Sequence, residues 1–171
     1  MNVKIREQEY ADAPAVHSLL MRTFGDDDEA RLMERLQEEE ADRISFVALA
    51  EDKIVGQILF SPVSFDNDID SYALALAPLA VLPQYQGQGI GSKLVRRGLD
   101  QAIVFHYALV FVLGDPGYFH RFGFDTAAKH NYFCEYDVPD ENFMVNFLRL
   151  KPSTQFPTVI SYSPAFNNFA D

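Results

Sequence analysis

Three glycines at alternate positions, followed by an amphipathic helix, are the strongest chemical signal in this sequence. The run Leu76–Leu82 is apolar, Pro83 interrupts it, and Gly87, Gly89 and Gly91 follow. Beyond these glycines, apolar residues recur at helical spacing, namely Ile90, Leu94, Val95, Leu99, Ala102 and Ile103. The stretch therefore predicts a strand, a glycine-rich loop and a helix, in that order.

A loop of this kind is suited to binding a phosphate or a pyrophosphate. The first N–H groups of a helix lack internal partners, and the helix dipole makes that end electropositive. Glycines let a ligand approach the backbone closely, so the amides form a concave anion site. Two common phosphate loops do not fit, because the chain has no Gly-x-x-x-x-Gly-Lys-Ser/Thr string and Ser92 stands where a third dinucleotide-binding glycine would be. An ordinary glycine-rich turn before a helix is the alternative.

The stretch Gln86-Gly-Gln-Gly-Ile-Gly91 resembles motif A of the GNAT superfamily of N-acetyltransferases, whose loop reads Gln/Arg-x-x-Gly-x-Gly/Ala. Phe122-Gly-Phe124 is similar to the Gly-Phe that closes motif B of that family. The resemblance implies that loop amides hold the pyrophosphate of acetyl-CoA or coenzyme A, and that a strand backbone pairs with the pantetheine. The cofactor-binding residues that it implies are Leu79, Ala80, Val81, Gln86, Gly87, Gln88, Gly89, Ile90, Gly91 and Ser92.

Acetyl transfer from a thioester to an amine also needs a neutral amine and a proton for the departing thiolate. In much of the GNAT superfamily, a Tyr four residues before the Gly of Gly-Phe donates that proton, whereas this chain has Phe119 there. Tyr118 and His120, which flank it, are the candidate catalytic residues; packing and surface roles are their alternatives. No carboxylate lies between Tyr72 and Leu82, so the base that some members carry on that strand is absent.

Other potentially reactive residues receive structural interpretations. We expect His17 to be structural, and Cys134 to be a small buried hydrophobic residue rather than a nucleophile. Because Cys134 is the sole cysteine, no internal disulfide or cysteine metal cluster can form, and no metal site is expected. The acidic loop Asp66–Asp70 lacks the Gly and the downstream Glu of a calcium loop.

Composition sets the broad class of the protein. A chain of 171 residues with a hydrophobic share of 48% and 15 Phe predicts a single globular domain over residues 1–171. A net charge of −11 opposes binding to nucleic acid; it would suit a cationic acceptor, although solubility explains it equally well. No apolar run reaches the length of a membrane span and no signal peptide is recognisable, so we expect a cytoplasmic protein without membrane association.

The expected fold is α/β (α+β). Strands are predicted at 3–6, 45–49, 53–62, 72–82, 107–113, 132–136 and 143–150, and helices from Asp12, over 28–40, from Ile90 and from Tyr118 to Gly123. Asp12 is the expected N-cap of the first helix, and Pro78 predicts a bulge in its strand or a break in the ladder of hydrogen bonds. The order matches the GNAT fold, which implies a mixed, mostly antiparallel sheet of about seven strands flanked by about four helices.

The resulting prediction is an acetyl-CoA-dependent N-acetyltransferase, an acyltransferase acting on a primary amine of a small molecule, peptide or protein by direct attack on the thioester. The alternative is a CoA-binding regulatory module with weak or lost catalysis, since Phe119 replaces the usual acid. A third interpretation is an interaction domain that docks through a tail containing Phe166 and Phe169. Family members often pair, so a homodimer is a further expectation.

Overall fold

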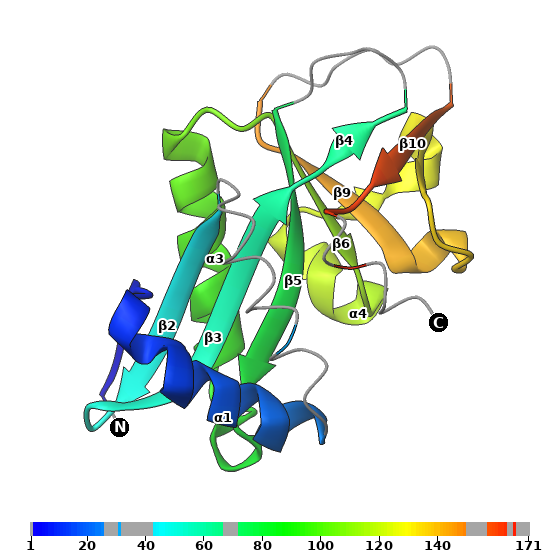
Figure 1. Ribbon diagram of the computed structural model, residues 1–171. Helices are drawn as coiled ribbons and strands as arrows, with labels where there is room; N and C mark the ends of the chain where they lie inside the picture. Colours follow the sequence, from blue (N-terminus) through cyan, green and yellow to red (C-terminus); the bar gives the residue numbers. More distant parts are fainter. Residues whose placement is uncertain are drawn as a thin grey trace. The chain divides into compact units, whose positions relative to one another are not determined.

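The computed structural model describes residues 2–25, 31, 43–66, 72–149, 157–163 and 166. Their contacts fall into two compact units, residues 1–60 with 78–101, and residues 61–77 with 102–171. Seven strands are hydrogen-bonded in the order β1-β2-β3-β5-β6-β9-β7, which confirms the predicted sheet (Figure 1). The predicted helix over 28–40 lies outside the described residues, Arg31 excepted, and the single domain stays a prediction.

The bounds of the elements agree closely with the sequence prediction. The strands of the seven-stranded sheet are β1 (Val3–Glu7), β2 (Ile44–Ala50), β3 (Lys53–Pro62), β5 (Ala73–Val81), β6 (Leu109–Leu113), β9 (Phe143–Phe147) and β7 (Asp125–Thr126). The helices are α1 (Ala13–Phe24), α3 (Ile90–Val104) and the short α4 (Pro116–Phe119), with 3-10 turns η1 (Tyr10–Asp12), η2 (Pro83–Tyr85), η3 (His120–Phe122), η4 (Ala127–His130) and η5 (Asp140–Asn142). No helix in the described part of the chain is both long and apolar enough to cross a membrane.

An antiparallel ladder organises the first unit. Strand β2 pairs on one side with β1 and on the other with β3. The tight turn between β2 and β3 places Glu51 and Asp52 at φ values of 51° and 64°, the left-handed pair that a two-residue hairpin requires. The strands predicted at 45–49 and 53–62 therefore form a hairpin.

Helix α1 begins after Asp12, but the predicted capping role of this residue is wrong. The Asp12 carboxylate makes no hydrogen bond to the amides of α1. It accepts two hydrogen bonds from the Arg6 guanidinium, at 2.7 and 2.9 Å, and one from the Glu9 amide at 2.7 Å. These charged partners hold the pKa of Asp12 below its usual value, the Arg6 hydrogen bond contributing most. At the other end, Gly25 closes α1 in the left-handed conformation.

Helix α3 packs against β3 through two glycines, on the face opposite α1 (Figure 1). A Cβ atom at Gly98 would lie 2.1 Å from the Phe60 ring, and a Cβ atom at Gly56 would lie 3.1 Å from Leu94. The register between β2 and β3 shifts beside Gly56. The Phe60 ring therefore lies against the backbone of α3 and the Leu94 side chain lies against the backbone of β3, which helps to fix the position of the start of α3.

The second unit is built around β6. Its antiparallel partner is β9, which also pairs with β7. The parallel ladder between β5 and β6 runs from Ala73 opposite Leu109 to Leu76 opposite Val112. Strand β5 continues beyond this ladder through Pro78, which has no N–H group to donate. The ladder between β5 and β6 therefore ends before Pro78, whereas β5 itself continues without interruption.

A second sheet of three strands corrects the sequence prediction. Strand β8 (Tyr132–Cys134), predicted as part of the main sheet, pairs instead with β10 (Thr158–Ser161), and β10 also pairs with β4 (Ser64–Phe65). Strands β4, β7 and β10 were not predicted. Beyond β10, Phe166 is buried and packs edge-on against Tyr162 at 5.3 Å, so it is a packing residue rather than a free docking group. Phe169 lies outside the described residues.

The contact between Gly98 and Phe60 leads to a stability prediction. Gly98→Ala should lower the free energy of unfolding by about 1–2 kcal/mol. Overpacking destabilises the fold by about 1–3 kcal/mol, and the better helix propensity of Ala offsets about 1 kcal/mol of this loss. Chemical denaturation would measure the difference. Asp100→Ala, on the exposed face of the same helix, is the control and should change stability by less than about 0.5 kcal/mol. Equal stability of Gly98→Ala and the parent chain would contradict the close packing.

Candidate active site

The glycine loop joins β5 to α3 in the first unit. Gly87 and Gly89 have φ values of +76° and +83°, a conformation that residues with a Cβ rarely adopt. A Cβ atom built at either glycine would meet nothing within 4 Å, so the loop is open to its surroundings. Ile90 is buried and anchors the first turn of the helix.

Six consecutive backbone amides in this loop have no backbone acceptor within the described residues. The amide of Gln86 is used in a turn with Pro83 O at 3.3 Å, and the amide of Lys93 donates to Gly89 O at 3.1 Å. The amides of Gly87 through Ser92 lie between these two, at the electropositive end of a 15-residue helix. Such a set of donors is the arrangement that binds a phosphate or a pyrophosphate.

Gln86 contributes through its side chain as well. Its Nε2 atom donates to the carbonyl of Val81 at 2.9 Å and holds the loop against the end of β5. The predicted cofactor residues Leu79, Ala80 and Val81 form this end of β5, beyond the last residue that pairs with β6. The structure thus brings all ten predicted cofactor residues together in one unit.

Of the three basic residues that follow the loop, only Lys93 is both exposed and without a partner among the described residues. The guanidinium of Arg97 lies 4.7 Å from the centre of the Phe46 ring, where it makes a cation–π contact. Arg97 therefore contributes to packing on β2 in addition to its positive charge.

The candidate catalytic residues lie in the second unit, at the junction of α4 and η3. Helix α4 begins at Pro116, because Asp115 caps it by accepting a hydrogen bond from the Gly117 amide at 2.9 Å. Gly123 ends η3 at φ 93°, in the left-handed conformation typical of a helix terminus. The predicted short helix ending at Gly123 is confirmed, although it starts two residues earlier than predicted.

The three residues around the usual acid position have different environments. Phe119 is 8% exposed and packs edge-on against Phe124 at 5.8 Å. Tyr118 is half-buried, its ring lies 4.6 Å from the Arg121 guanidinium carbon, and its hydroxyl has no hydrogen-bond partner within the described residues. His120 is exposed. Among the described residues, its ring makes no aromatic, cation–π or hydrogen-bond contact.

The other histidines lie elsewhere. His130 Nε2 is 3.1 Å from Asp125 Oδ2, and its ring packs edge-on against Phe147. This hydrogen bond is the largest cause of the lowered pKa of Asp125. His106 contacts Arg149 through Nδ1. We assign packing and ion-pair roles to these residues.

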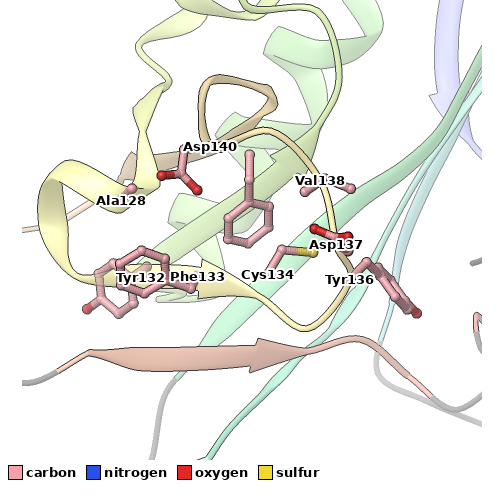
Figure 2. A pocket seen from close by; sticks show the side chains of 9 residues that line it. Ala128, Tyr132, Phe133, Cys134, Tyr136, Asp137, Val138 and Asp140 are labelled. Carbon is pink, nitrogen blue, oxygen red and sulfur yellow. The ribbon is translucent and has the colours of Figure 1, made fainter.

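A pocket that the sequence analysis missed lies in the second unit, between β8 and η5 (Figure 2). It has a volume of about 210 Å³. Cys134 lines it, and burial raises the pKa of its thiol, as expected for a structural cysteine. Burial also raises the pKa of Tyr136 to about 12, so this residue stays protonated at neutral pH. The only sequence signal for the pocket is the aromatic and acidic alternation in Tyr132–Asp140.

The model of the acetyltransferase (GNAT) family matches residues 13–124. The chain belongs to the GNAT acetyltransferase family. It is 36% identical over 166 residues to the uncharacterized N-acetyltransferase YhbS of Escherichia coli, covering 96% of this chain and 99% of YhbS. It is 38% identical over 151 residues to the uncharacterized N-acetyltransferase YjhQ of the same species, covering 84% and 83% of the two chains.

Solved structures agree with this family assignment. The chain matches the crystal structure of E. coli YhbS in complex with CoA at a TM-score of 0.92 and 35% identity, covering 99% of this chain and 94% of that one. It matches a GNAT acetyltransferase from Brucella melitensis in complex with acetyl-CoA at a TM-score of 0.80 and 27% identity, covering 97% and 99%. The predicted family, fold class and enzyme class are confirmed, and acetyl-CoA is the cofactor of the family.

The environment of Cys134 leads to a prediction about reactivity. Because the thiolate is the reactive form and its pKa is raised, little thiolate is present at pH 7, and alkylation by iodoacetamide should be slow. The rate should increase only as the pH passes above the range of an ordinary thiol. Mass spectrometry would follow labelling, with urea-unfolded protein as the control. Equal labelling rates of native and unfolded protein at pH 7 would contradict this structural role.

Proposed function

We propose that this acetyltransferase transfers an acetyl group from acetyl-CoA to a primary amine by direct attack of the amine on the thioester. The observation that carries the proposal is the run of six amides, Gly87 to Ser92, without backbone acceptors at the start of α3. The CoA and acetyl-CoA complexes of similar proteins support the same cofactor here. The loop amides would hold the pyrophosphate, and the backbone of Leu79–Val81 would hold the pantetheine as an added strand.

The chemistry assigns separate tasks to the chain. Acetyl-CoA supplies an acetyl thioester, which is already activated toward an amine. The amine nitrogen attacks the carbonyl carbon, the C–S bond breaks, the sulfur gains a proton and the nitrogen loses one. The chain therefore has to position the two partners and deliver the proton to sulfur.

Tyr118 is the proposed proton donor. Its hydroxyl has no hydrogen-bond partner among the described residues, whereas Phe119 is buried and has no proton to give. His120 lies two residues along on an exposed turn and is the second candidate. For the base, water or the ionisation equilibrium of the amine itself suffices, since the end of β5 carries no carboxylate.

The decisive experiment measures acetyl-CoA-dependent release of free thiol with a panel of primary amines. Release with one class of amine supports the proposal and defines the acceptor chemistry. Saturable CoA binding without release from any amine would overturn it in favour of the regulatory alternative, which the named N-acetyltransferase relatives do not support. Measurement of the oligomeric state in solution would test the predicted homodimer. The homodimer and the cytoplasmic location both stay predictions.

The proposed cradle can be tested with a matched pair of glycine variants. Gly89→Ala should weaken CoA affinity about tenfold, because a left-handed residue with a Cβ costs about 1–2 kcal/mol and the loop must shift to relieve it. Gly25→Ala imposes the same strain at φ 80° at the end of α1 and should leave CoA affinity unchanged. Calorimetric titration with CoA would measure both. If both variants lost the same CoA affinity, the loss would reflect the lower stability of the fold and not a specific role of the glycine loop.

The proton donor is tested by exchanging the two neighbouring rings. Tyr118→Phe should lower kcat about 100-fold with little change in the KM for acetyl-CoA, since loss of general acid catalysis acts on the chemical step. The double variant Tyr118→Phe/Phe119→Tyr tests whether a tyrosine at position 119, where other family members carry it, can donate the proton instead. An unchanged kcat in Tyr118→Phe would remove Tyr118 from the mechanism and move the role to His120.

A further inference from the structure

The pocket between β8 and η5 has a marked chemical character. Its walls are formed by four aromatic rings and two carboxylates, namely those of Tyr132, Phe133, Tyr136, Phe143, Asp137 and Asp140. In Figure 2, β8 carries Tyr132, Phe133 and Cys134 along one side, and the segment from Tyr136 to Asp140 closes the other. The described residues that line it include no Lys, Arg or His. A pocket with these walls has a negative potential and favours a cationic guest.

Neither carboxylate has a basic partner among the described residues. Asp137 and Asp140 make no ion pair and accept no side-chain hydrogen bond within the described residues, in contrast to Asp12 and Asp125, which each have a basic partner there. They also belong to no group of three or more His, Cys, Asp or Glu residues that could hold a metal ion in that part of the chain. An organic cation is therefore a better match than a divalent metal.

The aromatic walls are rigid, which makes them suitable for recognition. Phe143 stacks on Phe111 with ring centres 5.5 Å apart and an angle of 5° between the planes. Tyr132 packs edge-on against the same Phe111 at 5.3 Å. Phe143 and Tyr132 are 2% exposed, so they form a rigid base, and the partly exposed rings of Phe133 and Tyr136 provide the accessible aromatic surface. Such a surface beside carboxylates would attract an ammonium, because cation–π and ionic attraction add to each other.

The rim of the pocket is joined to the helix that carries the proposed acid. The Gly114 amide donates to Asn142 O at 2.9 Å, and Asn142 Nδ2 donates to Gly114 O at 3.1 Å. Asn142 ends η5, between Asp140 and Phe143 of the pocket, and Gly114 lies directly before the cap of α4, four residues from Tyr118. Pocket and helix are thus held by one reciprocal pair of hydrogen bonds, as expected for two parts of a single acceptor site.

The amine that reacts cannot be the amine that these carboxylates hold. Nearby negative charge favours the protonated form of an amine, whereas attack on a thioester requires the neutral form. We propose that this pocket binds a second, non-reacting ammonium group, so that the preferred acceptor is a small aliphatic diamine or polyamine. A volume of about 210 Å³ fits an ammonium with a few methylene groups, and it is smaller than the 300–1,000 Å³ typical of sites for drug-sized ligands.

This inference rests on the proposed amine acetylation, and a matched pair of acceptors tests it. 1,5-Diaminopentane and pentylamine share a carbon chain and differ only in the second amine. We expect the diamine to have a KM at least about tenfold lower, an advantage that decreases as ionic strength rises. Asp137→Asn and Asp140→Asn should each raise the KM for the diamine about threefold, and the double variant about tenfold, with the KM for pentylamine unchanged.

Glu141→Gln is the matched control, because Glu141 is an exposed carboxylate of η5, next to Asp140, that does not line the pocket. It should leave the KM for both acceptors unchanged. Equal KM values for diamine and monoamine, or a double variant with unaltered discrimination and an unaltered thermal midpoint, would overturn the inference. A preference for peptide acceptors over both small amines would also overturn it.

A direct titration separates this inference from the proposed function. Calorimetry with 1,5-diaminopentane and no acetyl-CoA measures occupancy of the pocket without catalysis. Binding that the double variant weakens about tenfold supports the pocket even if no acetyl transfer is found. Acetyl transfer to amines with no such binding by the parent chain would retain the proposed function and overturn the pocket.

Discussion

The close approach of α3 to β3 is the constraint on which the cofactor half of this protein depends. Gly98 lets the ring of Phe60 lie against the backbone of α3, and Gly56 leaves room in β3 for the side chain of Leu94. These contacts help to fix the first turn of α3, and with it the direction of the free amides from Gly87 to Ser92. A looser helix would leave the same glycines in the sequence but would not hold their amides in one place, and affinity for a pyrophosphate depends on that preorganisation.

In the second unit, aromatic packing takes a comparable part. Phe119 fills the space beside Gly114, where a Cβ atom would lie 2.7 Å from its ring, and it contacts Phe124. A tyrosine at this position would have to place a hydroxyl among these buried groups or displace them. The change from Tyr to Phe is therefore accommodated by the packing, and the neighbouring Tyr118 retains a hydroxyl that is available for chemistry.

The parts of the fold that were predictable from the sequence depend on local physics. Gly25 and Gly123 terminate helices because each adopts a left-handed conformation within a single turn, and the glycine loop is recognisable from its own spacing. The exceptions depend on partners outside the helix concerned. The carboxylate of Asp12 is held by Arg6, six residues earlier, and by the Glu9 amide in the capping box of η1, and not by the amides of α1.

The unpredicted part of the candidate site has the same origin. Tyr132–Cys134 has the pattern of a strand, but its sheet is decided by Thr158–Ile160, more than twenty residues later. Asp137 and Asp140 look like ordinary loop acids until the fold places aromatic rings around them. Their missing ion-pair partners become informative only when the surroundings of each carboxylate are known.

The parallel pairing of β10 with β8 has a consequence for the order in which the protein is made. Besides this ladder, the Tyr162 amide donates to Glu135 Oε2 at 2.7 Å, and the Glu135 amide donates to Ile160 O at 3.1 Å. The wall of the pocket is thus secured by residues 158–162, whereas every strand of the first unit and all of the glycine loop precede residue 102. During synthesis on the ribosome, the unit that contains the glycine loop can therefore fold before the chain that completes the pocket has been made.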